Sequence, residues 1–187
     1  MQDNNEKLKK QFNDMLQAMS IDMALEQQEQ VLSYIFLLKK WNSTYNLTAI
    51  RSLDEMLTHH LIDSLAIAPY IQGNNIVDVG TGAGFPGVPL AVYFPDKRFT
   101  LVDSRGKKIR FIRQACSQLD IHNVTLFDQR VETLSIEPAF DVIMARAVSS
   151  LGNVVSLCRH LLSPGGRFIL QKGEYPEKEL SELQLPY

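Results

Sequence analysis

The sequence predicts an α/β fold, in which helices flank a mostly parallel sheet and a helical N-terminal extension precedes it. From about residue 75, short apolar runs with strand character alternate with helical segments, which is the pattern of βαβ units. Before that point the apolar residues recur only with helical spacing. We therefore expect an extension over residues 1–72 and a ligand-binding core over residues 73–187, packed as one compact unit.

The extension is expected to hold three helices. Apolar residues share one helical face over about residues 6–19 and again over 25–41. A third helix is expected to begin at Ser52, because Ser52 and Glu55 have the spacing of a capping box. The polar and β-branched residues of segment 41–48 predict a loop between the second and third helices.

The core is expected to contain five parallel strands and three connecting helices. The strands are expected near residues 76–79, 99–102, 124–127, 142–145 and 168–170. The helices are expected near residues 88–93, 107–119 and 151–162. Pro164-Gly165-Gly166 predicts a turn before the last strand, and residues 174–187 show only weak helical character.

Composition is that of an ordinary globular protein, with 45% hydrophobic and 21% charged residues. The net charge of −2 argues against a large non-specific nucleic-acid binder but allows one local basic patch. Cys116 and Cys158 lie in apolar helical patterns and are expected to be buried reduced thiols of a cytoplasmic protein. The sequence shows no signal peptide and no membrane-spanning run. His59 and His60 lack companions at metal-ligand spacing, so no metal site is expected.

The strongest functional signal is the glycine-rich turn that joins the first strand to the next helix, within residues 77–87. Two ligand classes fit its glycines. Gly82-x-Gly84-x-x-Gly87 matches a dinucleotide fingerprint, whereas Gly80-x-Gly82-x-Gly84 preceded by Asp78 matches a loop that binds S-adenosylmethionine. Asp78 favours the second class, because a carboxylate repels a pyrophosphate and suits the ammonium of a methionine moiety.

A second acidic residue lies at the predicted end of the next strand. Asp103 directly follows Thr100-Leu101-Val102 at the predicted end of the second strand, where a carboxylate can accept hydrogen bonds from both ribose hydroxyls. This position supports a nucleoside ligand without distinguishing between the two classes. Asp103 also has a purely structural alternative, which is to cap the helix that follows.

Further motifs accompany the loop in a specific order. They are Trp41-Asn42-x-x-Tyr45-Asn46-Leu47-Thr48, His60-x-x-Asp63-Ser64, the loop Asp78–Gly87, Leu101-Val102-Asp103-Ser104, and Lys108-x-x-Phe111. Together they resemble the glucose-inhibited division protein B family, the bacterial guanine-N7 methyltransferases of small-subunit (16S) ribosomal RNA. The resemblance extends from about residue 25 to Lys172-Gly173.

The resemblance implies a Rossmann-like class I methyltransferase fold with S-adenosylmethionine bound along the loop. The implied cofactor-binding residues are Asp78, Gly80, Gly82, Gly84, Phe85, Asp103, Val131, Glu132 and Arg146. Such sheets usually have seven strands and family members usually continue past residue 173. The C-terminal strands are therefore expected to be missing from a chain that ends at Tyr187.

The implied reaction needs no general base, because guanine N7 carries a lone pair and no proton. Catalysis is expected to rest on positioning alone, so no catalytic acid–base residue is expected. The target base must also leave its stack to reach the methyl group. Candidate substrate-binding residues are Asn46, His60, Asp63 and Lys172, with Glu174 as a further acceptor for the guanine N–H groups.

Two groups of side chains have both a functional and a structural interpretation. The basic run Arg105, Lys107, Lys108, Arg110 and Arg113 either binds phosphates or forms a solvated helix face, and the second is favoured. Trp41 and Tyr45 either stack on bases or pack between the extension and the core, and core packing is favoured.

The expected partner is 16S ribosomal RNA or the small ribosomal subunit, bound by a monomer without membrane or metal. An NAD-dependent oxidoreductase is the first alternative, but Asp78 opposes it and no Tyr-x-x-x-Lys proton relay follows the loop. A non-catalytic RNA-binding assembly factor with the same fold is the second. Asp78→Ala is expected to abolish cofactor binding and to leave the fold intact.

Overall fold

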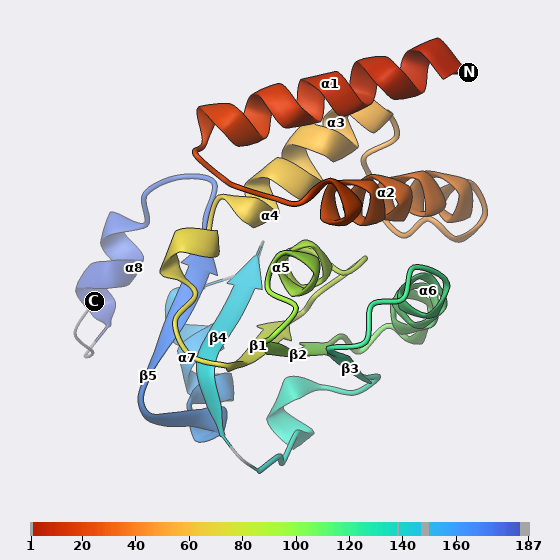
Figure 1. The fold of residues 1–187 in the computed structure, drawn as a ribbon. Coiled ribbons are helices and arrows are strands. Elements are labelled where there is room, and N and C mark those ends of the chain that lie inside the picture. The colour runs from red at the N-terminus through yellow and green to blue at the C-terminus, as the bar shows by residue number, and fades with distance from the viewer. Residues whose placement is uncertain (1, 138, 147–149, 184–187) are drawn as a thin grey trace.

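The computed structural model describes residues 2–137, 139–146 and 150–183, and it forms a five-stranded, wholly parallel sheet. The strand order is β3-β2-β1-β4-β5, so the chain crosses over between β3 and β4 (Figure 1). The strands are β1 (Asn75–Val79), β2 (Arg98–Val102), β3 (Val124–Phe127), β4 (Phe140–Arg146) and β5 (Leu162–Gln171). Their carboxyl ends meet at one edge, where open α/β sheets bind ligands.

Two hydrophobic clusters cover the two faces of the sheet. The central strands alternate between the clusters, so that Ile76 and Met144 point to one face whereas Val77 and Ile143 point to the other. The first face is covered by α5 (Gly87–Tyr93) and α6 (Gly106–Gln118). The second face is covered by α7 (Leu151–Cys158), the 3-10 turn η3 (Val131–Thr133) and their flanking residues.

The N-terminal extension packs over α5 and α6, on the first face (Figure 1). It consists of α1 (Gln2–Ala18), α2 (Leu25–Tyr45), α3 (Leu53–Met56), the π-helix η1 (Leu57–Ile62), α4 (Asp63–Leu65) and the short turn η2 (Ala68–Tyr70). Phe12 and Tyr34 of the extension are fully buried in the same cluster as Phe111 of the core. Extension and core therefore share one hydrophobic interior.

The helix expected from Ser52 differs from the prediction. Ser52 does cap α3, because its Oγ accepts the N–H of Glu55 at 3.2 Å. In a full capping box the Glu55 carboxylate would accept from the backbone N–H of Ser52. Here it accepts from the Ser52 hydroxyl instead, at 2.9 Å. The helix then widens into the π-helix η1 instead of continuing as α-helix. Such widened turns often occur at functional sites, and this one carries His60.

Other helix and strand boundaries differ from the predicted ones because of local backbone conformation. Helix α2 continues to Tyr45 and ends where Asn46 adopts the left-handed conformation, with φ of 47°, so the predicted loop begins later than residue 41. The expected turn at residues 164–166 lies within the bounds of β5, where the pairing with β4 shifts in register. The C-terminal segment contains α8 (Glu177–Glu182), and residues 184–187 lie outside the described residues.

The five predicted strands and the three predicted core helices are all present, each within a few residues of its expected position, although β4 and β5 extend further. Cys116 and Cys158 are free and buried, as expected. No helix within the described ranges is both long enough and apolar enough to span a membrane.

Candidate functional site

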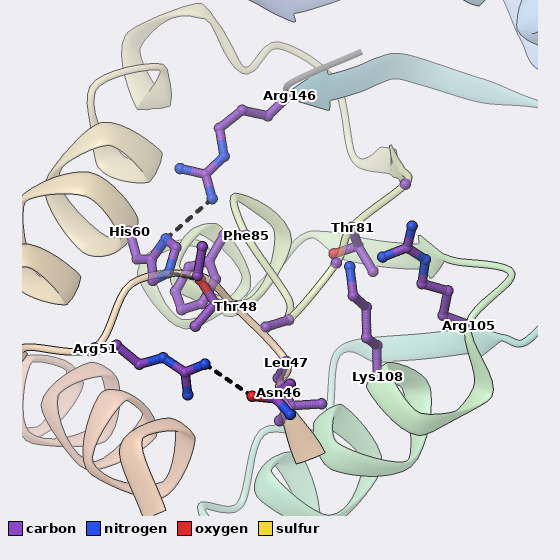
Figure 2. Close-up of a pocket in the computed structure, with 14 residues that line it drawn as sticks. Asn46, Leu47, Thr48, Arg51, His60, Thr81, Phe85, Arg105, Lys108 and Arg146 are labelled. Carbon is purple, nitrogen blue, oxygen red and sulfur yellow. Dashed lines mark hydrogen bonds between the residues drawn. The ribbon is translucent and has the colours of Figure 1, made fainter. Parts of the chain in front are cut away.

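Two adjoining cavities open at the carboxyl edge of the sheet. The larger, of about 530 Å³, lies between the glycine loop and residues 46–51 (Figure 2), and we call it the loop cavity. The smaller, of about 350 Å³, lies between the ends of β2 and β3, and we call it the nucleoside cavity. Gly80, Arg105 and Lys108 line both cavities, so one extended ligand can occupy the two together.

The glycine loop is held by hydrogen bonds within the protein. Its backbone N–H groups are bonded to protein acceptors at Gly80, Thr81, Gly82, Gly84, Phe85 and Gly87. A pyrophosphate-binding loop must instead direct such groups at its ligand. The loop geometry therefore opposes the dinucleotide alternative, in agreement with the charge of Asp78.

Glycine is required at position 84 for two reasons. Its φ is +91°, which L side chains rarely adopt, and a Cβ there would overlap the Tyr34 hydroxyl and lie 2.8 Å from Val88 Cγ2. Tyr34 Oη also donates a hydrogen bond of 2.8 Å to the carbonyl oxygen of Ala83. The extension thus contacts the loop directly and fixes its path.

Asp78 lies beneath the loop and does not line either cavity. Its side chain is fully buried, and Oδ2 accepts hydrogen bonds from Thr81 Oγ1 at 2.6 Å and from the Gly87 N–H at 2.9 Å. Burial raises the pKa of Asp78 to about 6, although these two hydrogen bonds oppose the shift. Among the described residues, Oδ1 has no hydrogen-bond partner. Contact between Asp78 and a ligand ammonium stays a prediction.

Asp103 lies at the nucleoside cavity, at the end of β2. Its carboxylate accepts from the Gly82 N–H at 2.9 Å and from the Arg105 N–H at 2.8 Å. Lys108 Nζ lies 3.9 Å from Oδ2. Val131 and Glu132 also line this cavity. The structure thus gathers the three predicted nucleoside-binding residues Asp103, Val131 and Glu132 around one space.

The wall of the loop cavity opposite Lys108 is a connected cluster of three side chains. The imidazole of His60 stacks on the ring of Phe85, with ring centroids 4.4 Å apart and an interplanar angle of 12°. Arg146 donates to the backbone oxygen of His59 at 2.7 Å and lies 3.4 Å from His60 Nδ1 (Figure 2). Burial and the charge of Arg146 lower the pKa of His60 to about 4, so this imidazole is neutral near pH 7.

The four candidate substrate-binding residues fall into two groups. Asn46 and His60 line the loop cavity. Asp63 is half-exposed, lies outside the loop cavity and is 3.9 Å from His59 Nδ1. Lys172 binds Glu179 at 2.8 Å and, with Glu174, lines a separate groove beside β5 and α8. The structure therefore brings only Asn46 and His60 to the predicted cofactor site.

The basic side chains at the start of α6 and just before it have different surroundings. Arg105 and Lys108 line both cavities, whereas Lys107 donates to the backbone oxygens of Tyr45 and Asn46 at 2.9 and 3.3 Å. Arg113 is exposed. The interpretation of the run as only a solvated helix face is therefore wrong for its first residues.

Of the aromatic pair Trp41 and Tyr45, only Trp41 packs between the extension and the core. Trp41 contacts the rings of Tyr45 and Phe111, with centroids 5.2 and 5.7 Å apart. Trp41 therefore packs between the extension and the core, while Tyr45 remains 47% exposed.

Sequence reasoning missed several residues that line the loop cavity, most clearly Thr48 and Arg51. Thr48 belongs to the motif that ends at residue 48, and its motif position was the only available signal. With Arg51, four cationic side chains line this cavity and no carboxylate does, within the part of the chain that the structure describes. The four are Arg51, Arg105, Lys108 and Arg146. This charge pattern suits an anionic ligand.

The residues present fit S-adenosylmethionine. The acidic Asp103 borders a cavity suited to a nucleoside, and the loop cavity next to it offers cations for a carboxylate. The unpartnered Asp78 Oδ1 below the loop is a buried acceptor whose polar partner the described protein does not supply. No group of three metal-ligating side chains occurs within the described residues.

Comparison with solved structures supports the fold. An S-adenosylmethionine-dependent O-methyltransferase from Thermotoga maritima is 22% identical, with a TM-score of 0.56 over 65% of this chain and 48% of that chain. A methyltransferase structure from Thermoplasma acidophilum is 20% identical, with a TM-score of 0.51 over 60% of this chain and 50% of that chain. The predicted Rossmann-like class I methyltransferase fold is confirmed.

Comparison with known sequences gives the family. The relative from Photorhabdus laumondii is 48% identical over 164 residues, which are 87% of this chain and 80% of that protein. The relative from Alteromonas mediterranea is 45% identical over 168 residues, which are 90% of this chain and 80% of that protein. Both are named ribosomal RNA small subunit methyltransferase G.

A family model covers most of the chain as well. The model described as GidB, rRNA small subunit methyltransferase G, matches residues 27–186. This match confirms the predicted enzyme class, an S-adenosylmethionine-dependent methyltransferase, and rules out the oxidoreductase alternative. The chain therefore belongs to the GidB family of small-subunit ribosomal RNA methyltransferases.

Proposed function

We propose that this protein transfers the methyl group of S-adenosylmethionine to N7 of a guanine in 16S ribosomal RNA. The family assignment supports the reaction and the class of RNA. The observation that supports the site most strongly is the pair of adjoining cavities that share Gly80, Arg105 and Lys108. One cavity suits the nucleoside of the cofactor, and the other suits its methionine end together with the target base.

The cofactor-binding residues fall into three roles under this proposal. The Asp103 carboxylate accepts hydrogen bonds from the ribose hydroxyls, while Val131 and Glu132 border the adenine. Gly80 and Phe85 border the methionine end. When bound, S-adenosylmethionine supplies an electrophilic methyl group on a sulfonium.

Asp78 has a different role from its neighbours in the loop. Its Oδ2 holds Thr81 and Gly87 in place, so Asp78 positions the loop and supplies a buried negative charge below it. This buried charge would favour the ammonium group of a methionine moiety bound in the loop cavity. Asp78→Ala is therefore expected to weaken cofactor binding and also to loosen the loop. The sequence alone predicts a loss of cofactor binding with the fold intact.

The chain contributes positioning and electrostatics to the reaction. Guanine N7 needs no deprotonation, so the site has to hold base and methyl donor in line and to exclude water. Arg146 is anchored by the backbone oxygen of His59 and lines the loop cavity, which is the space proposed for the methionine end of the cofactor and the target base. The protein acts as a cytoplasmic monomer on 16S ribosomal RNA or the small subunit.

Label transfer tests this proposal. Small ribosomal subunits and naked 16S RNA, both from a strain that lacks the modification, are incubated with tritiated S-adenosylmethionine and the protein. We expect tritium in 7-methylguanosine after digestion of the RNA to nucleosides. Label in another nucleoside, or no label from a folded protein that binds S-adenosylhomocysteine, contradicts the proposal.

A further inference from the structure

Thr48 lies in a loop that one buried asparagine holds rigid. Asn42, at 2% exposure, accepts the backbone N–H groups of Leu47 and Thr48 through Oδ1, at 2.7 and 2.9 Å. Its Nδ2 donates to the backbone oxygen of Ile50 at 3.1 Å. These three hydrogen bonds all hold the backbone of residues 47–50, so the side chain of Thr48 lines the loop cavity from a fixed backbone.

The partners of His60 determine its tautomer. Arg146 Nη2 lies 3.4 Å from His60 Nδ1, and a guanidinium has only donors. The backbone oxygen of His59 also interacts with the imidazole, but Arg146 Nη1 already donates to that oxygen at 2.7 Å. We therefore assign the lone pair to Nδ1. The imidazole is neutral near pH 7 because burial and the Arg146 charge lower its pKa. Its single proton is therefore on Nε2, which lies 3.1 Å from Thr48 Oγ1.

This tautomer makes Thr48 a hydrogen-bond donor only. Oγ1 accepts from His60 Nε2–H at 3.1 Å and from the Ile50 N–H at 3.2 Å, which occupies both of its lone pairs. The described residues offer no acceptor to its own proton. Since Thr48 lines the loop cavity, that proton is available to a ligand there (Figure 2).

We propose that Thr48 is a specificity-determining residue whose hydroxyl donates to O6 of the target guanine. This inference rests on the proposed function. Guanine presents O6 as an acceptor where adenine presents an amino donor, so a side chain that can only donate accepts guanine and rejects adenine. A single neutral donor to O6 also leaves N7 free, whereas a bidentate arginine would occupy the nucleophile.

The methionine carboxylate is the competing acceptor in this cavity. Four cations line the cavity, and charged donors bind a carboxylate more strongly than a neutral hydroxyl does. The Thr48 hydroxyl is therefore assigned to the base, and the cations to the carboxylate and to phosphates. A Thr48 variant should accordingly change turnover on RNA without changing affinity for S-adenosylhomocysteine.

Kinetics of two variants test the assignment. Thr48→Val removes the hydroxyl with little change in shape, and Thr48→Ser retains the hydroxyl as the matched control. Thr48→Val removes the donor to O6 and also the acceptor of the Ile50 and His60 N–H groups. We expect kcat/KM on small subunits to fall at least about tenfold for Thr48→Val and to change less than about threefold for Thr48→Ser. The affinity for S-adenosylhomocysteine should stay within about twofold of wild type for both.

A substrate change separates a contact from an indirect effect. RNA with 2-aminopurine in place of the target guanine lacks O6, and we expect it to slow the wild type about tenfold and Thr48→Val hardly further. Additive losses, an unchanged rate for Thr48→Val, or an equal loss of S-adenosylhomocysteine affinity would overturn the assignment. If the wild type methylates no guanine at all, the result contradicts the proposed function itself and not only the role of Thr48.

Nitrogen NMR of the wild type tests the tautomer without any activity. With only four histidines in the chain, the His60 signals can be assigned by comparison with His60→Gln. We expect the Nε2–H tautomer at pH 7. The Nδ1–H tautomer would overturn the proposal, because Thr48 would then donate its proton to His60.

Discussion

The hydroxyl of Tyr34, in the middle of helix α2, donates a hydrogen bond of 2.8 Å to the carbonyl oxygen of Ala83 in the glycine loop. The tyrosine is fully buried, and its ring also packs against the ring of Phe85 in a T-shaped arrangement, with centroids 5.6 Å apart. The N-terminal extension therefore contributes to the predicted cofactor site, because Tyr34 supports the glycine loop.

Removal of that hydroxyl should weaken both the fold and the site. In Tyr34→Phe the Ala83 oxygen loses a partner in a buried position, so we expect the free energy of unfolding to fall by about 1–3 kcal/mol. Affinity for S-adenosylhomocysteine should fall as well, because the loop loses an anchor. Urea denaturation and isothermal titration calorimetry measure the two effects.

The matched control for this change is Tyr175→Phe, since Tyr175 is 78% exposed. We expect its unfolding free energy to remain within about 0.5 kcal/mol of wild type. Equal effects of the two substitutions would show that the contact between Tyr34 and the loop contributes nothing.

Two loop glycines should respond differently to alanine. At Gly84 a Cβ would overlap Tyr34 and approach Val88, whereas at Gly80 it would meet no atom within 4 Å. Both positions have positive φ, so both substitutions cost about 1–2 kcal/mol of backbone strain. We expect Gly84→Ala to lose about 1–3 kcal/mol more than Gly80→Ala in thermal or urea unfolding.

Cofactor affinity gives the second readout for these glycines. Gly84→Ala displaces the loop and should abolish binding of S-adenosylhomocysteine, while Gly80→Ala should remain folded and lose affinity only through the methyl group placed at the cavity wall. Wild-type affinity in Gly84→Ala would contradict the packing described for Tyr34 and the loop.

The buried Asp78 predicts a dependence of stability on pH. Its pKa rises to about 6 in the folded protein from an ordinary value of 3.8, so folding disfavours the charged carboxylate. Wild-type stability should therefore lose a contribution as the pH rises from about 4 to 6, by up to about 3 kcal/mol, and lose no more above that range.

Asp78→Asn isolates this contribution. The amide oxygen can still accept from Thr81 and Gly87, but the side chain carries no charge at any pH. We expect its unfolding free energy relative to wild type to increase between pH 4 and pH 7.5, measured by urea denaturation in buffers of matched ionic strength. A difference that stays constant with pH would mean that the carboxylate does not titrate in this range.

The cations of the loop cavity predict a salt dependence of RNA binding. Arg51 lines the cavity and is fixed by Asn46 Oδ1 at 2.9 Å, so it is positioned for a phosphate of the substrate. Arg51→Ala should weaken binding of 16S RNA and reduce the slope of log affinity against log salt by about one. The control Arg113→Ala, on the exposed face of α6, should retain the wild-type slope.

Much of the fold follows from local patterns. The apolar run before Gly80, the glycine loop and Asp103 at the end of β2 are local in sequence, and their spacing predicts a nucleoside-binding edge. The structure has a cavity at this edge, next to Asp103. The predicted strands agree with the observed ones because their apolar runs are short and bounded by turn residues.

The remaining features depend on packing between distant segments. The rotation of α6 against the sheet decides that Lys108 enters the cavities while Arg113 faces solvent, and the sequence of one helix does not contain that information. Asp78 is buried because Thr81 and Gly87 fold back over it. Thr48 becomes recognisable only when Asn42 and His60 are seen on either side of it.

The central claim is methylation of guanine N7 in 16S ribosomal RNA, and nucleoside mass spectrometry tests it most directly. A bacterial strain without its own enzyme would express either this protein or Gly84→Ala at matched levels, and its purified 16S RNA would be digested and analysed. The account predicts that the wild-type chain restores 7-methylguanosine and that Gly84→Ala does not. Absence of 7-methylguanosine, with a folded wild-type chain that binds S-adenosylhomocysteine, would contradict it.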